Sequence, residues 1–317
     1  MTLESAPVAA PAGLSGPAGG PPREQTRARY PDTEGYIERA GVRVFYEVYG
    51  SGEPAVLLLP TWSIVHSRAW KCQIPYLARH FRVVTFDGRG NGRSDRPKGA
   101  AQYTPEEFAG DALAVMDATS SKRTVLVALS CGALWATILA ADHPERVESV
   151  VYICPAVGLA PGHPERDVGP FDEPPDSDEG WAKYNSHYWQ RDYLGFLEFF
   201  FAKVFNEPHS SKQIEDSIAW ALDTDPGTLA ETTRGIGLAC RTETFKETCA
   251  RVRCPTLVVH GDQDLVRPHA QGEALARQTG GQLITLRGSG HMPTSRDPVR
   301  MNLLIREFVQ THWTRTA

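Results

Sequence analysis

The residue best placed for chemistry is Ser130, which stands where a strand-like run meets a helix-like run. Apolar residues 125–129 precede it, and the apolar stretch 133–141 follows almost at once. The small residues Ala128 and Gly132 lie two positions before and two after the serine. This pattern is typical of a nucleophile elbow, a sharp turn that exposes a serine hydroxyl, although glycine is more common at the first small position. The alternative is a buried strand followed by a helix that the serine merely caps.

A serine hydroxyl becomes a nucleophile only when a base takes its proton and an acid orients that base. Asp264 lies in the loop after the strand-like residues 257–260, and His291 lies in the glycine-rich segment 287–293 after the next one. The order serine, acid, histidine is the order that a nucleophile elbow requires. Asp262 is a rival for the acid, and each residue taken alone could be an ordinary turn or surface residue. Because all three fall in order at strand ends, we predict a catalytic triad.

A hole for an oxyanion is expected after the strand at residues 55–59, where Pro60, Thr61 and Trp62 follow. We predict that the backbone N–H groups of Trp62 and Cys131, the residue after the serine, bind the oxyanion. Cys131 is disfavoured as the nucleophile, since the spacing puts the serine between the two small residues.

Residues 87–95 contain three glycines and follow another strand-like run. Their spacing does not match a phosphate-binding loop, so a nucleotide site is disfavoured. We interpret them as a hydrogen-bonded scaffold beneath the site.

Strand-like and helix-like patterns alternate along the chain from residue 35. Near-continuous apolar runs are typical of strands that are covered on both faces of a parallel sheet. The sequence predicts helices over 104–118, opened by a capping box at Thr104 and Glu107, and near the C-terminus around residues 301–309. The expected strands are 42–49, 55–59, 82–86, 124–128, 147–153, 256–260 and 282–286. This alternation predicts an α/β fold.

The alternation stops between residues 160 and 248, where aromatic residues are frequent. We predict a helical cap over 160–248, inserted into a core formed by 31–159 and 249–317. Residues 1–30 are rich in Ala, Pro and Gly and are predicted to be a disordered tail.

The composition of the 317 residues argues against several classes of protein. The net charge is −5, and 22% of the residues are charged, with no basic stripe. We therefore expect neither a nucleic-acid partner nor a membrane partner. The six cysteines lack metal-ligand spacing and are typical of reduced thiols in a cytoplasmic protein. A homodimer is possible.

Together, Trp62, the 87–95 loop, the Ser130 elbow, Gly261-x-x-Asp264 and Gly290-His291 resemble the α/β-hydrolase superfamily. The resemblance covers the chain from about residue 35 to its end, except the cap. It implies an α/β-hydrolase fold: a mostly parallel twisted sheet flanked by helices, with an inserted helical cap. It also implies hydrolysis of a carboxylic ester through an acyl-enzyme on Ser130, without a metal or organic cofactor.

Two stretches, 60–68 and 128–133, look similar to bacterial monoalkyl phthalate hydrolases of the mono(2-ethylhexyl) phthalate type. This similarity implies a small-molecule ester substrate with an alkyl tail, an aromatic ring and a free carboxylate. Aromatic residues of the cap suit the tail and the ring, and a cation suits the carboxylate. The aromatic candidates are Trp181, Tyr184, Tyr188 and Trp189, and the cationic candidates are Arg68, Lys183, Arg191 and Arg234.

Other activities remain open at this point. A carbon–carbon bond hydrolase of aromatic degradation, a lactonase, an acyltransferase and a cofactor-free haloperoxidase would all use the same three residues. A serine at the elbow disfavours dehalogenases and epoxide hydrolases of this fold, which use aspartate there. A receptor that binds a small molecule with slow turnover is the alternative outside enzymes.

Overall fold

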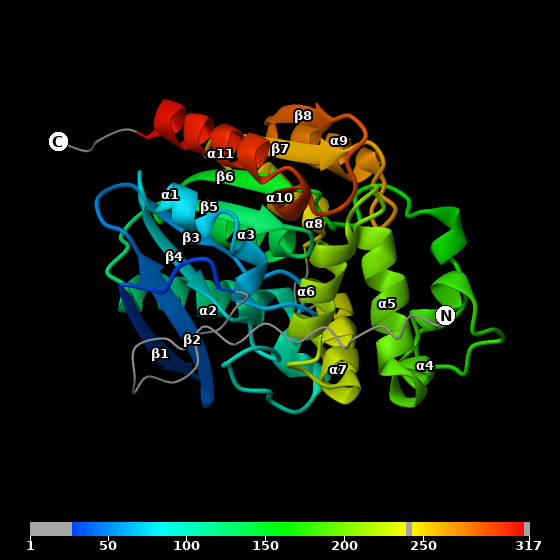
Figure 1. Ribbon diagram of the computed structural model, residues 1–317. Coiled ribbons are helices and arrows are strands. Elements are labelled where there is room, and N and C mark those ends of the chain that lie inside the picture. Colours follow the sequence, from blue (N-terminus) through cyan, green and yellow to red (C-terminus); the bar gives the residue numbers. More distant parts are fainter. Residues whose placement is uncertain (1–26, 239–242, 314–317) are drawn as a thin grey trace, which may run out of the picture.

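The computed structural model describes residues 27–238 and 243–313, and its centre is a twisted sheet of eight strands (Figure 1). The strand order is β1-β2-β4-β3-β5-β6-β7-β8. β2 is antiparallel to both of its neighbours, and every other pair is parallel. The strands are β1 (Thr33–Arg39), β2 (Val42–Tyr49), β3 (Ala55–Leu58), β4 (Arg82–Phe86), β5 (Thr124–Leu129), β6 (Val147–Ile153), β7 (Thr256–Gly261) and β8 (Gln282–Leu286). The predicted mostly parallel sheet is confirmed.

The central strands β3, β5, β6 and β7 are buried along their whole length. Their apolar runs reflect this position, because helices cover both faces of the sheet there. Successive side chains of β5 alternate between the two cores: Val127 and Leu129 pack on one face, and Leu126 and Ala128 on the other. The strand therefore ends with Ser130 directly above a rigid, fully packed base.

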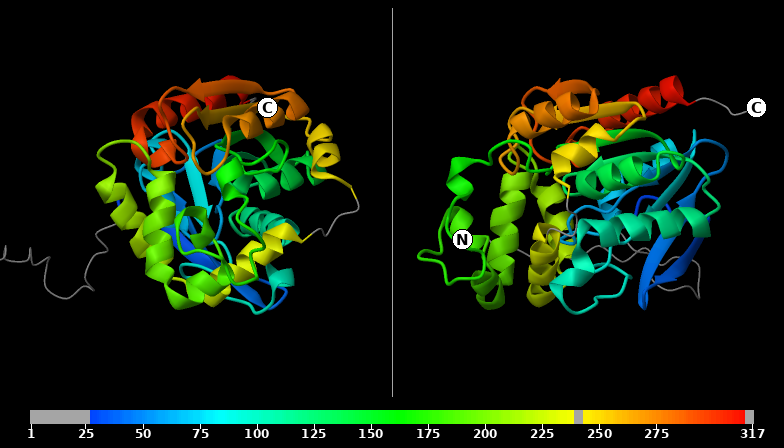
Figure 2. Two further views of the ribbon diagram at one scale, coloured as in Figure 1. Left: turned by 90° about the vertical axis from the view of Figure 1, so that its right-hand side faces the viewer. Right: turned by 180° about the vertical axis from the view of Figure 1, so that it is seen from behind.

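One face is covered by α1 (Ile74–Leu77) and α11 (Pro298–His312), and the opposite face by α2 (Pro105–Ala118), α3 (Gly132–Asp142) and α9 (His269–Thr279). Figures 1 and 2 show α11 and α2 on opposite sides of the sheet. The helix predicted at 104–118 is confirmed as α2, with Thr104 as its N-cap. The reciprocal half of the capping box does not form, because the Glu107 carboxylate pairs with Arg39 instead.

Between β6 and β7 the chain forms helices that stand beside the sheet domain in both figures. They are α4 (Ser186–Arg191), α5 (Tyr193–Val204), α6 (Ser211–Ala221) and α7 (Pro226–Gly237). The predicted end of the cap at residue 248 falls inside α8 (Phe245–Ala250), which packs against α3 and α9. Short 3₁₀ turns at 67–70, 100–103, 164–166 and 180–183 and the one-turn α10 (Pro293–Arg296) complete the described elements.

Residues 1–26 of the predicted tail lie outside the described residues. From Arg27 onward the chain is described, and the Arg27 guanidinium donates to the buried Glu47 carboxylate over 2.8 Å. Within the two described ranges, no helix has both the length and the apolar character needed to cross a bilayer.

Candidate active site

Ser130 occupies a strained turn between β5 and α3. Its φ of +54° lies in the left-handed region, which residues with a side chain seldom adopt. The turn is tight, because a Cβ on Gly132 would lie 3.0 Å from the Pro60 carbonyl oxygen and 3.5 Å from the Ala128 Cβ. The close approach to Pro60 therefore favours glycine at position 132. The strain raises the serine hydroxyl above the sheet, as a nucleophile elbow does.

The three predicted triad residues meet at the carboxyl ends of β5, β7 and β8. The Asp264 Oδ2 atom lies 2.7 Å from His291 Nδ1, and His291 Nε2 lies 3.0 Å from Ser130 Oγ. Because an ionised carboxylate only accepts hydrogen bonds, we assign the proton to Nδ1. Nε2 then carries the free lone pair and faces the serine hydroxyl. This tautomer is the one that can act as a general base.

The Asp264 carboxylate is buried but fully hydrogen-bonded. Oδ1 accepts the backbone N–H groups of Val266 and Arg267, both at 2.8 Å, and Oδ2 accepts from His291 and from His260 Nε2 at 3.1 Å. Burial alone would raise the pKa of this carboxyl. The electrostatic interaction with His291 and the hydrogen bonds from both histidines outweigh burial and hold the pKa well below its usual range. Asp264 is therefore a fixed negative charge beside His291.

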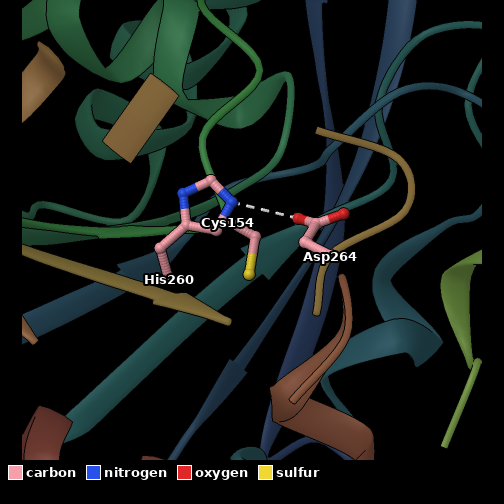
Figure 3. Close-up of side chains that lie close together, drawn as sticks. All are labelled: Cys154, His260 and Asp264. Atoms are coloured by element: carbon pink, nitrogen blue, oxygen red, sulfur yellow. Dashed lines mark hydrogen bonds and ion pairs between the residues drawn. The ribbon is translucent and has the colours of Figure 1, made fainter. Parts of the chain in front are cut away.

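Cys154, His260 and Asp264 form a buried cluster in which the ligand atoms lie within 4.8 Å of one another (Figure 3). Both neighbours of His260 Nε2, the Asp264 carboxylate and the Arg267 carbonyl, are acceptors, so this nitrogen carries a proton and cannot ligate a metal. Burial raises the pKa of the Cys154 thiol well above its usual value, and the Asp264 charge adds to this. The donor set fits a hydrogen-bonded support for Asp264 better than a metal centre.

The segment after α5 holds the two loops that carry the acid and the base. The Val204 carbonyl accepts the backbone N–H of His291 at 3.2 Å, and Glu207 accepts that of Gly290 at 2.7 Å. Asn206 donates to the Gln263 carbonyl, next to Asp264 in the chain. The inserted helices therefore position the triad as well as covering it.

Trp62 and Cys131 line the same cavity as Ser130. In the described parts of the chain, neither backbone N–H has a hydrogen-bond acceptor, so both are free to bind an oxyanion. The Trp62 indole donates to Thr232 Oγ1 of α7 at 3.0 Å, which ties this loop to the inserted helices. Burial raises the pKa of the Cys131 thiol, so the thiol is a poor nucleophile.

The 87–95 loop is the hydrogen-bonded scaffold that the sequence predicts. Asp87 accepts the backbone N–H groups of Ser67 and Arg93. Arg89 binds Asp111 of α2 through two hydrogen bonds of 2.7 Å, and both side chains are fully buried. The loop thus anchors the segment that follows Trp62 to the sheet domain.

Two cavities meet at Ser130 and share Trp62 and Phe200. The first, here called the arginine cavity, has a volume of about 230 Å³ and is also lined by Cys131, Arg166, Tyr184 and Arg267. The second, the apolar cavity, has a volume of about 40 Å³ and is lined mostly by aliphatic and aromatic side chains, together with His291. A wider hollow of about 430 Å³ lies at the opposite ends of β3 and β4, away from the triad.

Of the four aromatic candidates for substrate binding, only Tyr184 lines a cavity beside Ser130. Trp181 stacks against the Arg166 guanidinium, 4.1 Å from its ring centre. Trp189 is fully buried and packs against Trp62 with ring centres 5.8 Å apart. The Tyr188 hydroxyl donates to Asp192. These three side chains form the interior of the cap rather than the walls of the site.

None of the predicted cationic candidates lines the two cavities beside Ser130. The Arg68 guanidinium pairs with Glu47 at 3.1 Å. Arg191 pairs with Asp178, and Arg234 pairs with Asp172 at 2.6 Å. Each has an acidic partner that the sequence alone did not reveal. The Lys183 ammonium lies over the Tyr188 ring, 5.5 Å from its centre.

Sequence reasoning missed Arg166 and Arg267, the two charged residues of the arginine cavity. Arg267 follows the acid by three positions in the loop after β7, where ligand-binding residues gather in α/β sheets. That position was a usable signal. Arg166 carried none, because it lies among Pro, Asp and Glu residues in an irregular segment.

Comparison with known proteins agrees with this geometry. Residues 54–295 match the model of a family described as alpha/beta hydrolase fold. The chain is 28% identical to a putative non-heme chloroperoxidase of Synechocystis sp. over 295 residues, which cover 88% of this chain and 99% of that protein. It is 26% identical to a pimeloyl-[acyl-carrier protein] methyl ester esterase of Aeromonas hydrophila, covering 84% and 99% of the two chains. A solved structure described as Est816, an N-acyl homoserine lactone degrading enzyme, superposes with a TM-score of 0.71 and is 27% identical, covering 87% and 100%. The predicted fold class is thereby confirmed.

Proposed function

Since the chain belongs to the α/β hydrolase family, we propose that it is a carboxylic ester hydrolase that works through an acyl-enzyme on Ser130. The observation that carries the proposal is the chain of hydrogen bonds from Asp264 through His291 to the Ser130 hydroxyl. The relatives described as an ester hydrolase and a lactone-degrading enzyme support the same bond type.

The first half of the reaction forms the acyl-enzyme. His291 Nε2 takes the proton of Ser130 as Oγ attacks the ester carbonyl carbon, and the carbonyl oxygen becomes an oxyanion. The fixed charge of Asp264 stabilises the imidazolium. The tetrahedral intermediate collapses when its bond to the alcohol oxygen breaks, and His291 gives its proton to that oxygen. The alcohol leaves, and the acyl group stays on Ser130.

The second half repeats these steps with water. His291 takes a proton from water, the hydroxide attacks the acyl carbon, and the serine oxygen leaves with the proton from His291. The backbone N–H groups of Trp62 and Cys131 would hold the oxyanion in both halves. In this position each donor typically lowers the barrier by about 3–4 kcal/mol.

We propose a monoalkyl phthalate as the substrate. The similarity of residues 60–68 and 128–133 to monoalkyl phthalate hydrolases supports this choice. Aromatic side chains on the cavity walls, Trp62, Tyr184 and Phe200, add support because they suit a ring. A lactone is the second candidate, since it is a cyclic ester and the lactone-degrading Est816 covers 87% of this chain.

Hydrolysis of p-nitrophenyl butyrate tests the proposal with a single variant. We expect the wild-type protein to release p-nitrophenol in a burst followed by a steady rate, and Ser130→Ala to lose both phases. Cys131→Ser is the matched control, because it alters the neighbouring side chain but keeps its backbone N–H. Turnover that persists in Ser130→Ala would contradict the proposal.

A further inference from the structure

The two arginines of the arginine cavity, Arg166 and Arg267, lie beside Ser130 but are not part of the triad. In residues 27–238 and 243–313, neither Arg166 nor Arg267 forms an ion pair with a carboxylate, and no acidic side chain lines the cavity. Arg166 donates to the Val266 carbonyl at 2.7 Å and stacks over Trp181 and Tyr184. The Nε atom of Arg267 is buried without a hydrogen-bond partner in the same residues. Within the described residues Arg166 donates one hydrogen bond, so the two guanidinium groups retain N–H donors for a ligand.

The guanidinium groups lie close enough to repel each other. Burial, and next to it the charge of Arg267, lowers the pKa of Arg166 to about 10. Both positive charges also act on Cys131, the residue after the nucleophile, and on Tyr184. Two partly buried like charges close together are unfavourable for the fold, and Asp264, the carboxylate that acts on Arg166, is already hydrogen-bonded to two histidines. Such an arrangement is typical of a site that receives its negative charge from a ligand.

The position of His291 gives the bound ester a direction. His291 lines the apolar cavity and not the arginine cavity. Because the histidine must protonate the leaving alcohol, the alcohol part has to lie on its side of Ser130. That side is lined by apolar residues such as Val65, Phe201 and Met292. The acyl part then occupies the arginine cavity.

We propose that Arg166 and Arg267 form a carboxylate-binding site that selects esters whose acyl part carries a free carboxylate and whose alcohol part is apolar. The planar guanidinium fork matches a carboxylate through paired hydrogen bonds. Aromatic walls at Tyr184 and Phe200 accommodate a flat acyl group between the carboxylate and the ester. The selectivity rests on the ester hydrolysis proposed above, whereas binding of the anion does not.

The test compares monobutyl phthalate with butyl benzoate, which has the same alcohol and lacks only the carboxylate. We expect Arg267→Gln to lower kcat/KM for monobutyl phthalate by roughly 10- to 100-fold, the effect of losing a charge-assisted hydrogen bond. For butyl benzoate, kcat/KM should fall much less, because that ester has no carboxylate for the guanidinium to bind. Arg267→Lys keeps the charge but not the fork, so it should restore part of the preference.

Two controls protect this comparison. Arg277→Gln removes the same charge from a side chain that is 68% exposed on α9, and it should alter neither substrate. Arg166→Lys tests the second arginine and keeps a cationic side chain packed against Trp181. A urea unfolding curve checks that each variant is folded. Equal losses on both esters, or an unchanged ratio of the two kcat/KM values in both Arg166→Lys and Arg267→Gln, would overturn the proposal.

Binding of phthalate to the Ser130→Ala variant separates the site from the reaction. By calorimetry, phthalate should bind to Ser130→Ala at least about tenfold more tightly than to the double variant Ser130→Ala/Arg267→Gln. Equal affinities would refute the carboxylate site even if ester hydrolysis is confirmed. If phthalate binds more tightly to Ser130→Ala than to the double variant, but the wild-type protein hydrolyses no ester, the proposed function is refuted and the carboxylate site is supported.

Discussion

Replacement of Asp264 by asparagine tests the base of the proposed site in detail. Four N–H groups point at the carboxylate: two backbone donors, from Val266 and Arg267, reach Oδ1, and two histidine rings reach Oδ2. An asparagine can keep the backbone pair only by turning its oxygen toward them. Its NH₂ group then faces His291 Nδ1, which must accept a hydrogen bond instead of donating one.

In that tautomer the proton of His291 lies on Nε2, opposite the Ser130 hydroxyl, and the base is lost. Because the base and the negative charge of Asp264 are both lost, we expect kcat for p-nitrophenyl butyrate to fall by about 10⁴. This fall is equivalent to about 5 kcal/mol of transition-state free energy. The burst of p-nitrophenol should disappear as well, because acylation, like deacylation, needs the base.

Asp262→Asn is the matched control for this variant. Asp262 is exposed and accepts the Gly288 backbone N–H at 2.7 Å, and an asparagine oxygen can accept it equally. We expect kcat within about twofold of wild type. If Asp264→Asn keeps more than a tenth of kcat, or if Asp262→Asn loses as much as Asp264→Asn, the assignment of the acid is refuted.

Three further predictions concern stability. Because the pKa of Asp264 is lowered by folding, its ionised form stabilises the protein above the unfolded-state pKa of about 3.9, and this contribution should fade as the pH falls further; urea unfolding from pH 6 to pH 3 measures it. Arg89→Met should cost about 3–5 kcal/mol of unfolding free energy, because it removes a buried charge partner of Asp111. Thr232→Val should cost about 1–3 kcal/mol, because it leaves the Trp62 indole N–H without its acceptor.

Each of these stability effects has a result that would contradict it. The first prediction is contradicted if the unfolding free energy depends on pH equally in Asp264→Asn and in the wild-type protein. For the second, Arg146→Met breaks the more exposed pair with Asp117, where a loss of less than about 1 kcal/mol is expected. An equal loss in both arginine variants would show that burial does not decide the cost. An unchanged urea midpoint in Thr232→Val would disprove the third.

The meeting of Ser130, Asp264 and His291 could be predicted from the chain for a physical reason. Each residue follows a buried strand, and the carboxyl ends of parallel strands lie at one edge of a sheet. The strand β1 could not be predicted in the same way. It lies at the sheet edge, where water reaches most of its side chains, and only Ile37 is buried. The sequence of β1 therefore contains no apolar run of the kind that indicated the central strands.

The cationic residues that bind a substrate carboxylate could not be predicted from the sequence. Arg234 and Arg68 looked as suitable as any other arginine, yet Asp172 and Glu47 neutralise them through contacts made only by folding. Arg166 and Arg267 are 101 positions apart, and they come together because the segment after β6 bonds to the loop after β7: His163 bonds the Asp264 carbonyl, and Arg166 donates to the Val266 carbonyl, both at 2.7 Å. Whether an arginine is paired depends on tertiary contacts, and no local pattern records them.

The most direct test of the account is to find the residue that carries the acyl group. A reaction with p-nitrophenyl butyrate, quenched in acid within the burst and digested, should yield a peptide that is heavier by one butyryl group at Ser130. The same peptide from Ser130→Ala should be unmodified. A butyryl group on Cys131, or no modified peptide despite a measured burst, would contradict the central claim that Ser130 is the nucleophile.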